Sequence, residues 1–503
     1  MSIARTSHSL KGRISEADSL RTRVNSTDAL LMIVFVLASA FYVWTAATSQ
    51  PLELDNGSSD RYNQLASALL HLHTWVAHAP AWLTKLSEPY NPAANSRAWF
   101  GSTDATNIGD DIYYRGYLYF LWGPAPAAVL LVPMHLLGWE PSSSVTVSVF
   151  GVAGLGFALA TLRVLLRQIG TRSLWMCALA AFAAAFSSAV PFLLRSPYVS
   201  ADTLAGGYCF SMAGVWLALS ALAAKRASLP HLALASLCFG LAAGARPVLA
   251  LTGLVLVPVY LALRAGRSSR ALLTALVAPI GVCGLLLLAY NQVRFGGPFE
   301  FGLHIQLTGY DSSTAPIGRL GYVLPGTWLY AITPPKLSAA FPFILLQTPS
   351  VASPSGLASS ELTGGLLPMA PIVLFLGALP WLWRRRPGRL GALAGGLMVL
   401  AGVGLILTLV PAFDFFASTE RYEVEFSTLF VLGGLAAWLG LSMELSGYRG
   451  WLVRAGGGAL ALWGSIAGFA ISLVGNGNLL AINHPQTWRT LEEIASPLSS
   501  LLR

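Results

Sequence analysis

Long apolar runs, separated by polar segments, recur along most of the chain. Runs of about 20 residues occur at 29–48, 271–290, 391–410 and 451–474, and each is long enough to cross ~30 Å of hydrocarbon as a helix. The pattern predicts an all-α polytopic membrane protein.

The complete set of runs predicts about 11 transmembrane helices. They cover 29–48, 145–166, 174–193, 207–224, 231–246, 248–264, 271–290, 366–383, 391–410, 427–444 and 451–474. A further apolar stretch, 117–137, contains Pro124, Pro126 and Pro133, and an interior proline removes a backbone hydrogen bond. We expect this stretch to be re-entrant or juxtamembrane; the alternative is a full crossing.

Basic residues set the expected orientation. They cluster in the N-terminal tail and in short connections, at Arg163/Arg167/Arg172, Lys225/Arg226, Arg264/Arg267/Arg270 and Arg384/Arg385/Arg386/Arg389. The positive-inside rule places such clusters in the cytoplasm. The predicted organisation is a cytoplasmic tail (1–28), a transmembrane core (29–290) with a first extracytoplasmic loop (49–116), a second extracytoplasmic loop (291–365), C-terminal transmembrane helices (366–474) and an extracytoplasmic tail (475–503). The protein is expected in an inner or plasma membrane.

Within the first long loop, the sequence RYNQLASALL has helical periodicity. Tyr62, Leu65, Ala66, Leu69 and Leu70 fall on one face, which predicts an amphipathic helix lying on the membrane surface.

Composition supports a membrane protein and argues against nucleic acid as a partner. The chain is 55% hydrophobic and only 11% charged, whereas soluble proteins average roughly 25% charged residues. The net charge of +9 comes from clusters between apolar runs, as expected for cytoplasmic loops. The four cysteines lie inside apolar runs, where a thiol behaves as a small packing residue.

Four predicted outside segments combine charged and aromatic residues next to a helix end. The candidates in them are Asp55, Asp60 and Tyr62; Asp110, Asp111, Tyr114 and Arg115; Arg195 and Asp202; and Arg421 and Tyr422. Arg246, in GARP, and Arg294 join them. Ionisable groups this close to hydrocarbon usually pair or line a cavity.

These residue types suit a phosphate-bearing lipid whose headgroup reacts. Arginines bind phosphate oxygens in a forked geometry, and a nearby carboxylate can accept a proton from a hydroxyl or hold a divalent metal. Asp60 and Asp111 are the candidate ligands for such a metal (Mg, Mn or Ca). Alternatives remain open at this point, since the aromatic residues also suit an interfacial belt and single arginines suit snorkelling anchors.

Several stretches, taken in order, resemble the GT-C glycosyltransferases, in particular bacterial members related to protein mannosyltransferases and lipid A aminoarabinose transferases. They are SDRYNQLASALL, YRGYLYFLWGPAP, RSPYVSADTL, GLAAGARPVL, YNQVRFGGPFEFG and ERYEVEF. Some relatives place an acid and a lysine before a double proline. Here those positions are Trp122 and Gly123, and Ala125 separates the prolines.

The resemblance implies a transferase that moves a sugar, with inversion, from a polyprenyl-phosphate donor to an acceptor hydroxyl outside the cytoplasm. It implies Asp60 as the first-loop acid, with Asp55 competing for that role, and Asp202 as a cavity acid. Asp111 or Asp110 would supply the second acid. Arg246 would lie near the donor phosphate, and we expect Arg294 and Arg421 to assist it. The acceptor, whether lipid, glycan or protein, stays open.

Other functions suit part of the same pattern. A transporter or flippase of lipid-linked sugars would use a similar basic pocket, but transporters commonly contain repeated halves, and no internal repeat is visible here. An O-antigen-type polymerase or ligase would rely on outside arginines more than on a carboxylate. A degenerate relative would bind lipid only.

Overall fold

The computed structural model describes residues 26–58, 60–100, 111–197, 199–224, 227–266, 268–315, 318–349, 359–385, 389–414 and 417–502. The fold is an all-α polytopic membrane fold with small sheets outside the bundle, as predicted. In the described part of the chain, seven helices are long and apolar enough to cross a membrane. They are Ser26–Ala47, α6 (Ser143–Ile169), Ser200–Ala223 within α9 (Val199–Ala223), α12 (Ser269–Phe295), Leu390–Phe413 within α16 (Arg389–Asp414), α17 (Ser427–Glu444) and α18 (Gly447–Val474).

The remaining predicted crossings form shorter or broken helices. Residues 174–193 form α7 (Leu174–Phe186) and α8 (Val190–Leu194), with a break at 187–189. The other shorter elements are α10 (Leu229–Ala245), the 3₁₀ helix η2 (Pro247–Val255), α11 (Leu256–Leu263), η3 (Arg264–Gly266), α14 (Leu366–Met369), the 3₁₀ helix η6 (Pro371–Ala378) and α15 (Leu379–Arg385). Prolines at the starts of α8, η2 and η6 explain the breaks, because proline suits the first turn of a helix but disfavours helical geometry in the residue before it.

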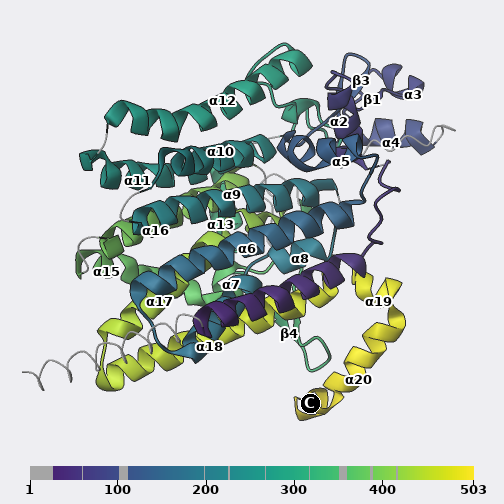
Figure 1. Cartoon of the computed structure of the whole chain (residues 1–503). Coiled ribbons are helices and arrows are strands. Elements are labelled where there is room, and N and C mark those ends of the chain that lie inside the picture. Colours follow the sequence, from purple (N-terminus) through teal and green to yellow (C-terminus); the bar gives the residue numbers. More distant parts are fainter. Residues whose placement is uncertain are drawn as a thin grey trace, which may run out of the picture.

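The helices lie side by side in one bundle (Figure 1). α9 lies between α6 and α10, and α10 in turn packs against α12. The apolar window of α9 is 89% buried, whereas that of α12 is only 17% buried, because α12 lies at the edge of the bundle. The segment η2, which follows α10, contacts α9, α10 and α16 and is therefore held from several sides.

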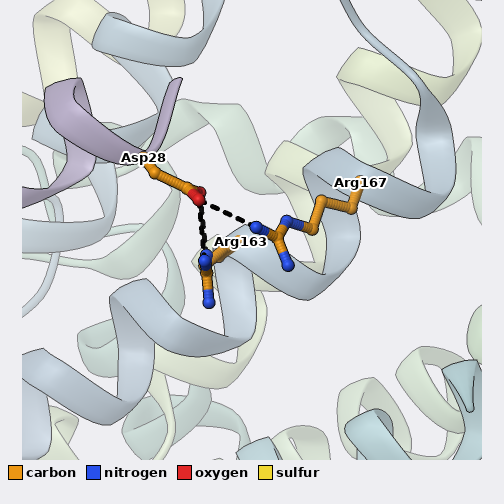
Figure 2. Close-up of polar contacts among 3 residues, drawn as sticks. All are labelled: Asp28, Arg163 and Arg167. Carbon is orange, nitrogen blue, oxygen red and sulfur yellow. Dashed lines mark hydrogen bonds and ion pairs between the residues drawn. The ribbon is translucent and has the colours of Figure 1, made fainter. Parts of the chain in front are cut away.

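The two ends of the bundle differ in charge and in loop length. At one end, here called the arginine end, lie the clusters at Arg163/Arg167 and Arg384/Arg385. Figure 2 shows Asp28, at the start of the first helix, bound to Arg163 and Arg167 near the end of α6, with Nη2–Oδ2 distances of 2.7 and 2.8 Å. These ion pairs join the first helix to α6.

At the opposite end, here called the loop end, a small sheet and several short helices cover the bundle. Strands β1 (Ala77–His78), β3 (Tyr117–Phe120) and β2 (Asp111–Tyr114) form an antiparallel sheet in the order β1-β3-β2. Arg115 and Gly116 join β2 to β3, both with positive φ, as a two-residue hairpin turn of the primed type requires.

The other loop-end elements are α2 (Arg61–Leu70), α3 (Ala81–Thr84), α4 (Pro92–Phe100), η4 (Leu303–Ile305), η5 (Leu320–Tyr322), α13 (Val323–Ala331), β4 (Lys336–Leu337) with β5 (Ile344–Leu345), β6 (Ser359–Ser360) with β7 (Ala417–Ser418), the 3₁₀ helix η7 (Glu420–Glu425), α19 (Leu479–Asn483) and α20 (Pro485–Leu501).

The proline-containing stretch 117–137 does not form one long helix. Its first residues belong to β3, and its helical part, the π-helix η1 (Ala127–Leu131) with α5 (Val132–Leu136), has 10 residues, or ~15 Å of helix. The predicted amphipathic helix is present as α2. Tyr62, Leu65 and Ala66 on its apolar face pack against Phe120 and Leu131, so much of that face is covered by protein, while Leu70 stays 37% exposed.

The segment WGPAP and the end of α10 approach each other at backbone contact. Gly123 N–H donates to the Ala245 carbonyl at 3.2 Å. A Cβ on Gly123 would come within 2.1 Å of the Gly244 carbonyl oxygen, which is backbone and cannot swing away. Only glycine therefore fits at position 123.

We predict that Gly123→Ala destabilises the protein by about 1–3 kcal/mol or more, because overpacking here must move backbone. Thermal unfolding of the purified protein checks this. Gly281→Ala is the matched control, because a Cβ there meets nothing within 4 Å and alanine is the better helix former by about 0.5–1 kcal/mol. Equal melting temperatures for the two variants would contradict the contact.

Candidate functional site

Arg246 is the centre of the charged site at the loop end. It directly follows α10 as the residue that caps the C-terminus of that helix, and it has an extended backbone (φ −140°, ψ 117°), because Pro247 follows it. Its guanidinium forms an ion pair with Glu425. The same guanidinium lies 4.7 Å from the ring centre of Trp122 and 5.1 Å from that of Tyr422. The charge is thus enclosed by one carboxylate and two aromatic faces.

The helix η7 presents three different faces because a 3₁₀ helix has three residues per turn. Residues i and i+3 share a face, so Tyr422 and Glu425 both reach Arg246. Arg421 lies on a second face, where it donates to Ser200 Oγ at 3.0 Å and to Glu361 Oε1 at 2.8 Å. Arg421 therefore joins the site through its neighbour Tyr422, over which its guanidinium also lies.

Two carboxylates meet at the start of α6. Ser143 N–H donates to Asp60 Oδ2 at 2.8 Å, and Ser143 Oγ–H donates to Asp202 Oδ2 at 2.7 Å. The positive end of the helix dipole favours anions at this place. Ser143 therefore holds Asp60, from the first long loop, beside Asp202, from α9.

Tyr62 lies close to both the carboxylates and the end of α10. Its hydroxyl donates to the Gly123 carbonyl at 3.2 Å, and Thr203 Oγ–H donates to the Ala245 carbonyl at 3.0 Å, next to Arg246. Burial raises the pKa of Tyr62 well above its ordinary value, with smaller effects from Thr203, Asp202 and Arg246. Tyr62 is therefore a neutral donor within reach of both charge systems.

Electrostatics make Asp60 a better base than an exposed aspartate. Burial raises the pKa of Asp60, and the hydrogen bonds from Ser143 offset part of that effect. A general base works best when its pKa approaches the working pH. Asp202 Oδ1 and Arg246 Nη1 are buried without a hydrogen-bond partner among the described residues, so each has capacity left for a ligand.

Asp111 lies in a different arrangement. It is fully buried and forms an ion pair with Arg61 at 2.5 Å. Since Arg61 directly follows Asp60, the structure brings Asp111 to the same end of α2. Asp55 lies exposed in the loop, and Asp110 falls outside the described residues.

The other predicted binding residues lie around this centre. Arg294 donates to the Phe120 carbonyl at 2.5 Å and lies over Tyr290, which adjoins the Tyr62 cluster. Tyr114 OH donates to the Phe295 carbonyl at 3.3 Å, and Arg115 lies over its ring in the hairpin turn.

Arg195 belongs to a separate contact. Its Nε–H donates to the Ser472 carbonyl near the end of α18 at 2.8 Å, and its Nη1–H donates to Thr48 Oγ1 at 2.6 Å. Burial lowers the pKa of Arg195 to about 10. This arginine joins the end of the first helix to α18, and its contacts within the described part of the chain do not reach Arg246.

Two functional residues were missed or undervalued by sequence reasoning. Ser143 was not predicted, although the sequence PSSS before an apolar run is a helix-start signal. Trp122 was noted only as a departure from the family pattern. In the structure it covers the guanidinium of Arg246.

The predicted metal ligands Asp60 and Asp111 do not make a shared metal site. Asp111 faces the guanidinium of Arg61, and Asp60 accepts a backbone N–H. Over the described ranges, no three or more histidine, cysteine or acidic side chains gather as metal ligands. The donor set here suits hydrogen bonding rather than a bridging cation.

No family model and no curated protein matches the chain. Among solved structures it is similar to ArnT from Cupriavidus metallidurans bound to undecaprenyl phosphate, with 16% identity over 92% of this chain and 78% of that chain and a TM-score of 0.44. It is also similar to the archaeal oligosaccharyltransferase AglB from Archaeoglobus fulgidus in complex with an inhibitory peptide and a dolichol-phosphate, with 12% identity over 90% of this chain and 56% of that chain and a TM-score of 0.45. Both are GT-C membrane glycosyltransferases, the class that the sequence motifs resemble.

We predict strong coupling between Arg246 and Glu425. Arg246→Met leaves Glu425 buried without its cation and should destabilise the protein by about 3–5 kcal/mol. Adding Glu425→Gln to Arg246→Met removes the unpaired charge and should restore much of that loss. Unfolding free energies of the two single variants and the double variant measure the coupling, and simple additivity would contradict a direct ion pair.

Proposed function

We propose that the protein is a membrane glycosyltransferase that moves a sugar from a polyprenyl-phosphate donor to an acceptor hydroxyl on the extracytoplasmic side. The observation that carries this proposal is the guanidinium of Arg246, enclosed by Trp122, Tyr422 and Glu425, with Nη1 unpartnered. A guanidinium with a free N–H suits a phosphate oxygen. The donor phosphate binds there, and the hexose or pentose extends toward Tyr62.

The carboxylates supply the second half of the reaction. The acceptor hydroxyl oxygen attacks the anomeric carbon and forms the new glycosidic bond. The bond between that carbon and the phosphate oxygen breaks, and polyprenyl phosphate leaves with the electron pair. Asp60 takes the hydroxyl proton as general base. Asp202 orients Ser143 and, through it, Asp60.

Arg246 also favours departure of the phosphate. The phosphate gains negative charge as the sugar bond breaks, and a preorganised cation next to the leaving oxygen lowers the barrier. Tyr62, a neutral donor, stabilises the sugar or phosphate without neutralising either charge system. The short helical stretch 127–136 and the aromatic hairpin suit a position at the membrane interface, and in this proposal the polyprenyl chain of the donor lies beside them.

Donor turnover is the first test. The purified full-length protein in lipid nanodiscs is incubated with a radiolabelled polyprenyl-phosphate sugar and a membrane extract as the acceptor source. We expect labelled sugar to appear in product and free polyprenyl phosphate to accumulate. Movement of intact donor across the membrane, with no release of polyprenyl phosphate, would make the protein a flippase and contradict the proposal.

We predict that Asp60→Asn lowers kcat by about 10²–10⁴-fold while leaving the melting temperature nearly unchanged, because the amide oxygen still accepts the Ser143 N–H. The wild-type rate should fall as the pH drops through the raised pKa of Asp60, because only the ionised form accepts a proton. The residual activity of Asp60→Asn should not show this fall in rate at low pH. An unaltered kcat would remove Asp60 from catalysis.

We predict that Arg246→Lys raises KM for the donor by about 10- to 100-fold, the loss of one charge-assisted hydrogen bond. Lysine keeps the charge but lacks the planar fork and stacks less well on Trp122 and Tyr422. Competition by polyprenyl phosphate measures the effect on donor binding. Arg195→Lys is the matched control, because Arg195 contacts the first helix and α18, and its donor KM should not change.

A further inference from the structure

The third face of η7 carries two acids that the proposed reaction does not use. Glu420 and Glu423 are three positions apart (i and i+3), so the 3₁₀ geometry stacks them on one face. Both side chains are buried, each with 2% relative exposure. They point away from the face that holds Arg246, since that face belongs to Tyr422 and Glu425.

A small internal cavity lies against this acidic face. Its polar lining comes from Glu420, Glu423, Ser427, Ser187 and Ser188, of which the last two occupy the break between α7 and α8. Residues of α14 and α18 complete the wall. The cavity has a volume of about 10 Å³, close to the space that one water molecule or one ion of similar radius needs.

The oxygen atoms in this cavity have unused bonding capacity. Glu423 Oε1, Ser187 Oγ and Ser188 Oγ are buried without a hydrogen-bond partner among the described residues. Glu420 Oε2 accepts the Gly364 N–H at 2.8 Å. Buried polar atoms are normally satisfied, so these oxygens have capacity for a ligand.

No lining residue supplies positive charge. The cavity lining contains no lysine, arginine or histidine, and the nearest arginines on η7 and α10 are engaged on other faces, Arg421 with Glu361 and Arg246 with Glu425. Two carboxylates buried side by side can both ionise only with a counter-charge next to them.

We propose that Glu420, Glu423, Ser187 and Ser188 bind one divalent cation, with Ca²⁺ the best fit. Two carboxylates match its charge, and their four oxygens with the two serine hydroxyls offer six oxygen ligands. Ca²⁺ takes six to eight oxygens in irregular geometry, whereas Mg²⁺ demands a near-ideal octahedron. A lining without cysteine or histidine favours a hard cation over zinc or copper.

Such an ion would tie η7 to the break between α7 and α8. It would therefore fix, from behind, the segment whose opposite face presents Tyr422 and Glu425 to Arg246. The cation is a structural ligand in this proposal and takes no part in sugar transfer, so the proposal stands independently of the reaction.

The test uses the full-length protein in detergent after treatment with a chelator. Equilibrium binding of radioactive ⁴⁵Ca²⁺ should reach one ion per chain. CaCl₂ should raise the melting temperature by several degrees, and MgCl₂ or NaCl at equal ionic strength should raise it less. A bound cation stabilises the native state according to its concentration relative to Kd, so the shift should grow with CaCl₂.

Variants separate ion binding from general stability. Glu423→Gln should lose most of the Ca²⁺ response. The double variant Glu420→Gln/Glu423→Gln should lose all of it, yet be at least as stable as the chelator-treated wild type, because neutral amides remove the buried repulsion. Glu361→Gln, which deletes a carboxylate outside the cavity, should keep the wild-type response. Absence of saturable Ca²⁺ binding, or equal binding by the double variant, would overturn the proposal.

Discussion

The enclosure of one guanidinium, that of Arg246, is the constraint on which the loop end depends. A cation held largely out of water is tolerated only where a counter-ion and polarisable faces surround it. Three segments far apart in the sequence supply these groups: WGPAP brings Trp122, η7 brings Tyr422 and Glu425, and α10 brings the arginine itself. The backbone contact at Gly123 follows from this arrangement, because Trp122 reaches the guanidinium only if its neighbour lies against the end of α10.

Because η7 is a 3₁₀ helix, its six residues lie on three faces, and each face contacts a different part of the protein. An α-helical turn would spread Glu420, Tyr422, Glu423 and Glu425 around 3.6 positions, whereas three residues per turn aligns them as two separate pairs. One pair closes the site around Arg246, and the other faces the cavity behind it.

The sequence predicted the class of fold and much of the site, for identifiable reasons. Apolar runs long enough to span a bilayer predict membrane helices directly. Charged and polar residues next to the ends of such runs are few, so the sequence alone identified Asp60, Asp202, Tyr62 and Arg246 as candidates. Periodicity did not reveal the break at 187–189, because an apolar run looks alike whether its helix is continuous or interrupted. The sequence also could not predict which group each acid contacts. Asp60 and Asp111 were both candidate metal ligands, and the tertiary fold pairs Asp111 with Arg61 and Asp60 with Ser143.

The contrast between those two acids shows why the proposed site keeps its charges apart. Where a carboxylate meets an arginine directly, as in Asp111 with Arg61, each satisfies the other and the pair serves the fold. Asp202 and Arg246 form no such pair with each other among the described residues, and each retains an unpartnered buried atom. Arg246 pairs with Glu425 and still keeps Nη1 available for a phosphate oxygen. The carboxylate proposed as the base, Asp60, accepts a backbone N–H instead of a cation, and a direct pair with an arginine would lower the basicity that the proposed step requires.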